Sequence, residues 1–135
     1  MAKHILIVDD TVDILRLMRM MLEEQRHQVS VLDSGQGVVE FVRHNKPDLI
    51  VLDLRLGDDI SGINVLRELK AEQETAAVPV VVYTASVVDA EKTERMIESE
   101  PDTYAGTRVL RKPFSLDDLL DIINRLEDPQ HATFS

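Results

Sequence analysis

Short runs of β-branched and other apolar residues alternate with longer stretches of helical periodicity along the chain. The apolar runs predict strands at residues 5–8, 29–32, 49–52, 78–83 and 109–110. Strands that alternate with helices are typical of repeated βα units, which build a parallel sheet with helices on both faces. The first, third and fourth runs are apolar throughout and predict central strands, whereas Ser30 predicts that the second is an edge. We therefore expect an α/β protein of the (βα)5 type.

The stretches between the strands carry apolar residues at helical spacing. The predicted helices are a first one with Leu15, Met18 and Leu22 on one face, three at residues 34–45, 63–70 and 89–99, and a last one that begins at Ser115. Asp118 follows Ser115 by three residues, which predicts a capping box at the start of the last helix. The helix at 89–99 is poor in apolar residues and is expected to be the most loosely held.

One domain accounts for this pattern. The 135 residues suit a single core; we expect the domain to cover residues 1–127 and residues 128–135 to form a flexible tail. The 15 basic and 25 acidic residues give a formal net charge of −10. This charge argues against direct binding to DNA, whose phosphates require a basic patch.

Cysteine is absent, which excludes disulfides, thiolate metal sites and cysteine nucleophiles. The apolar run near the N-terminus stops at Asp9, which is too early for a signal peptide. The other apolar runs are far shorter than the roughly 20 residues of a membrane-spanning helix. These observations predict a cytoplasmic protein without membrane insertion.

Polar residues follow four of the predicted strands. Asp9 and Asp10 follow the first, Asp53 ends the third, Thr84 ends the fourth and Lys112 follows the fifth. Because ligands bind at the carboxyl ends of the strands in an open parallel sheet, we expect these side chains to share one pocket. Each residue alone is typical of a turn, a strand end or a solvated surface, but their occurrence together favours a functional site.

Three carboxylates in one pocket repel each other, by on the order of 4 kcal/mol for a pair about 4 Å apart at an effective dielectric constant near 20. Such a cluster takes up protons or holds a cation. Carboxylate ligands without a nearby histidine or cysteine favour Mg²⁺, which commonly shares its coordination sphere with phosphate, over Zn²⁺.

Four short motifs carry a resemblance to a known family. They are Val8-Asp9-Asp10, Leu52-Asp53-Leu54, Tyr83-Thr84-Ala85 and Leu110-Arg111-Lys112-Pro113-Phe114. With these motifs in this order, the sequence resembles the receiver domains of bacterial two-component response regulators over nearly its whole length. The resemblance implies a flavodoxin-like fold with a five-stranded parallel sheet in the order 2-1-3-4-5.

The resemblance also implies roles for individual residues. Asp53 would be the phosphoacceptor, and Mg²⁺ would be held by the carboxylates of Asp10 and Asp53 and the backbone carbonyl of Arg55, with Asp9 acting through a bound water. Thr84 would hydrogen-bond the phosphoryl oxygens. A chain of this family is no enzyme toward other molecules and catalyses only its own phosphorylation and dephosphorylation.

Lys112 would form an ion pair with the phosphoryl group, and the peptide bond before Pro113 is cis in this family. The implied phosphoryl donor is a sensor histidine kinase or a histidine phosphotransfer protein. The state would pass to a downstream protein target, or to a second copy of the chain, through the face formed by the fourth helix, fifth strand and fifth helix.

Three positions depart from the pattern of the family. Gly57 stands where the family usually has proline, in a loop that is one residue longer, and the stretch 100–108 is also longer than usual. Val109 occupies the place where receivers often keep a switching tyrosine or phenylalanine. Because valine has no ring to swing inward, we expect the conformational change to be concentrated between Ser86 and Gly106.

Two other functions would use parts of the same pattern. A magnesium-dependent phosphatase of the haloacid-dehalogenase type would use Asp53 as a nucleophile, but it would need a second aspartate where Arg55 stands. A scaffold that is never phosphorylated would use the same fold for docking, but it would not need a complete pocket.

Overall fold

The computed structural model describes residues 3–56, 61–113 and 115–127. The five strands are β1 (His4–Val8), β2 (Gln28–Leu32), β3 (Leu49–Asp53), β4 (Val80–Thr84) and β5 (Thr107–Arg111). The helices are α1 (Val12–Glu24), α2 (Val38–Asn45), α3 (Gly62–Ala71), α4 (Val87–Ser99) and α5 (Leu116–Glu127). All strand pairs are parallel, and the sheet has the order β2-β1-β3-β4-β5, as predicted.

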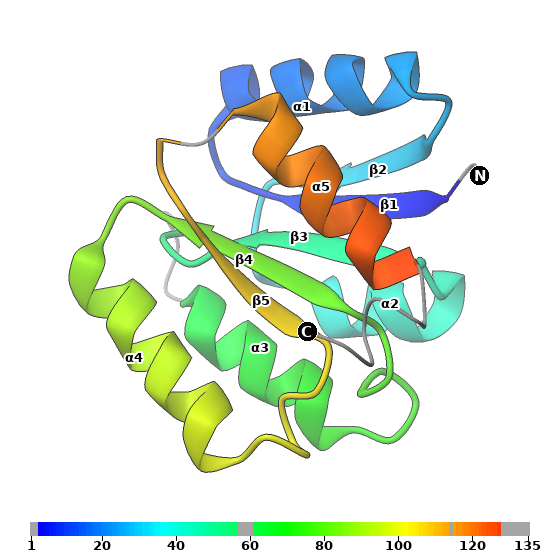
Figure 1. Cartoon of the computed structure of the whole chain (residues 1–135). Helices are drawn as coiled ribbons and strands as arrows, with labels where there is room; N and C mark the ends of the chain where they lie inside the picture. Colours follow the sequence, from blue (N-terminus) through cyan, green and yellow to red (C-terminus); the bar gives the residue numbers. More distant parts are fainter. Residues whose placement is uncertain (1–2, 57–60, 114, 128–135) are drawn as a thin grey trace.

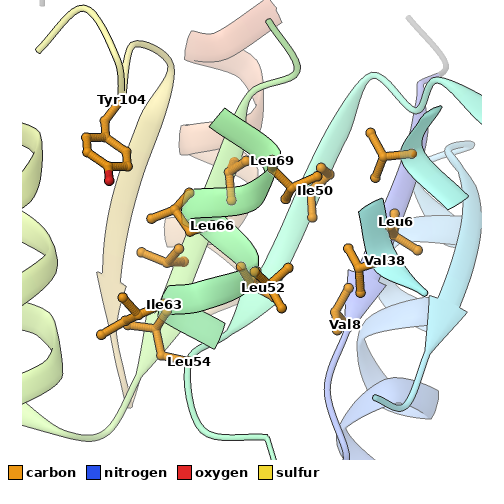
Figure 2. Close-up of a cluster of buried hydrophobic side chains, with 14 residues drawn as sticks. Leu6, Val8, Val38, Ile50, Leu52, Leu54, Ile63, Leu66, Leu69 and Tyr104 are labelled. Atoms are coloured by element: carbon orange, nitrogen blue, oxygen red, sulfur yellow. The ribbon is translucent and has the colours of Figure 1, made fainter. Parts of the chain in front are cut away.

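The sheet separates two hydrophobic clusters, because successive side chains of a strand point to opposite faces. On one face, Ile5 and Ile7 of β1 pack with Leu22 of α1 and Ile123 of α5. On the other, Leu6 and Val8 pack with residues of α2 and α3 (Figure 2). Figure 1 shows the resulting layers, with α1 and α5 on one side of the sheet and α2, α3 and α4 on the other.

The strand predictions were confirmed for the centre of the sheet and needed corrections elsewhere. The strands β1, β3 and β4 are central, and β2 is an edge. The fourth strand begins at Val80 rather than at residue 78, because Pro79 has no backbone N–H to donate to a ladder. The fifth strand is longer than predicted, since it pairs with β4 over all five residues although Thr107, Arg108 and Arg111 are polar.

The helix boundaries differ from the predictions at two N-termini. The second helix begins at Val38, four residues later than predicted, after Gly37 with a φ of +84°. The fourth begins at Val87, two residues earlier, because the Ser86 hydroxyl accepts a hydrogen bond from the amide of Asp89.

The predicted capping box of α5 was confirmed. The Ser115 hydroxyl accepts from the amide of Asp118 at 3.1 Å, and the Asp118 carboxylate accepts from the amide of Ser115 at the same distance. The predicted tail at 128–135 and the departure at Gly57 lie outside the described residues.

The segment that contains α4 has few buried anchors, as predicted. The buried side chains of α4 are those of Ala90 and Thr93. The long loop that follows is held by the buried Tyr104 and by Lys70, whose ammonium donates to the carbonyl of Ala105 at 3.0 Å. Among the described helices, none is both long and apolar enough to span a membrane.

Candidate functional site

The carboxyl ends of the central strands bring the predicted acidic residues together. Carboxylate oxygens of Asp9, Asp10 and Asp53 all lie within 4.8 Å of one another. The ammonium of Lys112 lies 3.9 Å from Oδ2 of Asp53. The Lys112 amide donates to the carbonyl of Thr84 at 2.8 Å, which ties the residue after β5 to the end of β4. The structure thus confirms the predicted convergence of these residues.

Asp53 ends β3, between β1 and β4, and only 4% of its surface is exposed. Its Oδ1 atom accepts a hydrogen bond of 3.0 Å from the amide of Arg55. Burial raises the pKa of Asp53 from 3.8 to about 6, although the Arg55 amide and the Lys112 charge favour the carboxylate. The charges of Asp9 and Asp10 raise this pKa further. A cation in the pocket would stabilise the charged carboxylate and so offset the effects of burial and of the neighbouring charges on this pKa.

Asp9 is fully buried and differs in this from Asp10, which is exposed. The Oδ1 atom of Asp9 accepts from the amide of Thr11 at 2.8 Å, and its Oδ2 atom accepts from the hydroxyl of Tyr83. Each oxygen of Asp9 therefore already has a donor within the protein.

Tyr83 is a site residue whose role sequence reasoning missed: it ends the apolar run of the fourth strand and begins one of the four motifs, but no function was assigned to it. Burial and the hydrogen bond to Asp9 raise the pKa of Tyr83 above its usual range. The hydroxyl therefore stays protonated and donates a hydrogen bond to Asp9. The ring also lies beneath the Lys112 ammonium, 4.6 Å from ring centroid to Nζ. The signal in the sequence was the tyrosine hydroxyl at the end of an otherwise apolar run.

Thr84 and Lys112 flank the acceptor from β4 and β5. Thr84 is buried, and its Oγ1 atom accepts from the amide of Ser86 at 3.0 Å. Because the amide uses the oxygen, the hydroxyl proton of Thr84 is left to donate to another group. The peptide bond between Lys112 and Pro113 is cis, as the resemblance implied.

Gly62 is a second residue that sequence reasoning missed. A Cβ atom at this position would lie 2.5 Å from Cα of Leu54 and even closer to the carbonyl oxygen of Asp53. Glycine thus permits the N-terminus of α3 to pack directly against the backbone of the acceptor, where the Gly62 amide donates to the carbonyl of Leu54 at 3.1 Å.

The side chain of Arg55 points toward α4. Its Nε atom lies 3.1 Å from Oδ2 of Asp89, and one terminal nitrogen donates to the hydroxyl of Ser86 at 3.3 Å. The expected role of the Arg55 carbonyl as a magnesium ligand stays a prediction. Val109 is partly buried and packs against the cluster on the side of α2, α3 and α4.

The fold and this pocket define an open parallel α/β domain with an acidic cluster at the carboxyl edge of its sheet. The sequence pattern of the response regulator receiver domain matches residues 5–124, and the chain therefore belongs to this family. Membership in this family places the chain in two-component signalling and not among the haloacid-dehalogenase-type phosphatases.

Individual relatives agree with this assignment. Protein PilH of Pseudomonas aeruginosa is 31% identical over 121 residues, which cover 90% of this chain and 94% of PilH. The polar-differentiation response regulator DivK of Brucella ovis is 28% identical, with coverage of 91% and 94%. Among solved structures, the receiver domain of the sensor histidine kinase PA1611 from Pseudomonas aeruginosa has a TM-score of 0.78 at 24% identity, over 95% of this chain and 100% of that domain, and contains a magnesium ion in its active site cleft.

Proposed function

We propose that this chain is a phosphorylation switch in which Asp53 accepts a phosphoryl group in a magnesium-dependent reaction. The donor is a phosphohistidine on a sensor histidine kinase or a histidine phosphotransfer protein. The observation that carries the proposal is the position of the Asp53 carboxylate, which is buried next to two further carboxylates and 3.9 Å from the Lys112 ammonium.

The transfer forms one bond and breaks one. A carboxylate oxygen of Asp53 forms a bond to phosphorus while the bond between phosphorus and the imidazole nitrogen of the donor breaks. The imidazole leaves with that electron pair and keeps the proton on its other nitrogen, so it departs neutral. Lys112 and the Thr84 hydroxyl stabilise the negative charge that spreads over the three phosphoryl oxygens.

The acidic cluster fits Mg²⁺ in its donor chemistry, because it offers several hard oxygen ligands close together. Asp10 and Asp53 would bind the ion directly with the carbonyl of Arg55. Asp9 would act through a water molecule, which suits a buried carboxylate whose two oxygens already accept from Thr11 and Tyr83. When bound, Mg²⁺ supplies positive charge for the phosphoryl oxygens. The magnesium ion of the PA1611 receiver domain supports this assignment.

The proposed output is a change of conformation and not turnover of a substrate. The chain would catalyse only its own phosphorylation and dephosphorylation. It would pass its state to a protein target, or to a second copy of the chain, through the face of α4, β5 and α5. Its net charge of −10 argues against DNA as the direct target.

Incubation with acetyl phosphate and Mg²⁺, followed by intact mass spectrometry, tests the proposal. We expect one phosphoryl group on the wild type and none on Asp53→Asn. The matched control is Asp102→Asn, because Asp102 is exposed in the loop after α4, and this variant should be labelled like the wild type. An unlabelled wild type would overturn the proposal in favour of a scaffold.

A further inference from the structure

An ion pair connects the loop after the acceptor to the first turn of α4. Nε of Arg55 lies 3.1 Å from Oδ2 of Asp89, and the guanidinium also donates to the hydroxyl of Ser86 at 3.3 Å. This Arg55–Asp89 bridge joins residues 34 positions apart in the sequence. The two segments that it joins, the loop after β3 and the start of α4, both contact residues of the phosphorylation site.

Both ends of the bridge are bonded to residues of the site. The amide of Arg55 holds Oδ1 of Asp53. At the other end, the amide of Ser86 donates to Oγ1 of Thr84, and the hydroxyl of Ser86 caps α4 by accepting from the amide of Asp89. A movement of the Arg55 side chain would therefore change the contacts of Ser86 and Asp89 at the start of α4.

We propose that Arg55 exchanges partners, leaving Asp89 and pairing with the phosphoryl group when Asp53 is phosphorylated, so that phosphorylation opens the Arg55–Asp89 bridge and releases the first turn of α4. This inference rests on the proposed function. A phosphoryl group carries up to two negative charges and offers several oxygens to the fork of a guanidinium. Asp89 offers a single charge and engages Arg55 through one oxygen.

The bridge is weak enough to be opened in this way. The side chain of Arg55 is 70% exposed and that of Asp89 is 24% exposed, so solvent screens the pair. Apart from the Ser86 cap, few contacts hold the first turn of α4, since Val87 and Val88 are exposed and the buried side chains of the helix begin at Ala90. Loss of the bridge should therefore change the order of this turn.

Thermodynamic coupling is reciprocal, so removal of the competing carboxylate must favour the phosphorylated state. A surface ion pair of ordinary strength corresponds to a change of about two- to five-fold in affinity. We expect Asp89→Asn to bind beryllium fluoride, a phosphoryl mimic, about two- to five-fold more tightly than the wild type in the presence of Mg²⁺. We also expect a longer lifetime of the phosphoryl group.

The matched control is Glu91→Gln, which removes the same charge from the exposed face of α4; Glu91 forms no ion pair within the described parts of the chain. It should bind beryllium fluoride like the wild type. The gain in affinity for beryllium fluoride should vanish when Arg55 is absent. The double variant Arg55→Ala/Asp89→Asn should therefore bind beryllium fluoride with the same affinity as Arg55→Ala. A general effect of charge on the helix would persist without Arg55.

Hydrogen exchange at residues 87–90 provides a readout that does not depend on affinity. Beryllium fluoride should speed exchange there in the wild type, and in Asp89→Asn the exchange should be fast from the start. Equal affinity of Asp89→Asn and the wild type, or a gain that survives in the double variant, would overturn the exchange of partners. A wild type that takes up neither beryllium fluoride nor a phosphoryl group would overturn the proposed function and this inference with it.

Discussion

Replacement of the acceptor by asparagine should stabilise the protein, in spite of the loss of function. Asp53 is 4% exposed, and burial raises the pKa of its carboxyl group from 3.8 to about 6. A pKa unit corresponds to 1.36 kcal/mol, so the charged carboxylate costs the folded state about 3 kcal/mol relative to the unfolded chain. Asp53→Asn removes that charge and should raise the free energy of unfolding by about this amount at pH 7.5.

The gain in the free energy of unfolding should decrease as the pH falls. Because the pKa is raised on folding, the cost is fully present above about pH 6 and disappears as the pH falls below the unfolded value near 4. At pH 4 the difference between Asp53→Asn and the wild type should therefore shrink to less than about 1 kcal/mol. Urea unfolding followed by circular dichroism, with EDTA present, measures the difference at both pH values.

Two further measurements make this prediction specific to the site. Asp102→Asn, at the exposed position, should show no such dependence on pH. Addition of Mg²⁺ at ten times its dissociation constant should stabilise the wild type by about 1.4 kcal/mol and close roughly half of the gap at pH 7.5. A gap that is equal at both pH values, or that Mg²⁺ leaves unchanged, would refute the electrostatic account of the pocket.

Three more predictions concern single residues. Asp10→Asn should weaken Mg²⁺ binding and prevent phosphorylation without loss of the fold; unchanged affinity in a magnesium titration would contradict this. Gly62→Ala should cost about 1–3 kcal/mol in urea unfolding, because the new Cβ would meet backbone 2.5 Å away, and a stability equal to that of the wild type would contradict the close approach. Burial lowers the pKa of Lys70 from 10.5 to about 8, so between pH 7 and 9.5 the wild type should gain about 2 kcal/mol relative to Lys70→Met. The exposed Lys92→Met should show no such difference, and parallel pH curves for wild type and Lys70→Met would refute the cost assigned to the buried ammonium.

The layered fold and the position of the acidic cluster could be predicted from the amino-acid sequence. Apolar runs and helical stripes are local signals, and parallel pairing then brings the strand ends to one edge of the sheet. Asp9, Asp53 and Lys112 could be placed there because each directly ends or follows a strand. The strand order came from the resemblance of four motifs to receiver domains, and the structure confirmed it.

The predicted boundaries of strands and helices were less accurate where a polar residue or a glycine interrupted the apolar pattern. The fifth strand was predicted too short, because its polar residues carry no apolar signal although their backbone pairs fully with β4. The second helix was predicted to begin too early, since the periodicity does not reveal that Gly37 adopts a positive φ.

The groups that contact and orient the site residues could not be identified before the tertiary structure was known. The hydroxyl of Tyr83 reaches Asp9 across 74 positions of the sequence, and the Arg55 side chain turns to Asp89 across 34. Neither contact leaves a local pattern, because each arises where separate elements pack against one another. The same holds for the close approach that requires glycine at position 62 and for the burial of Lys70 among three carbonyls. Local periodicity determines the strands and helices, whereas side-chain contacts between them exist only after the sheet and its helices have assembled.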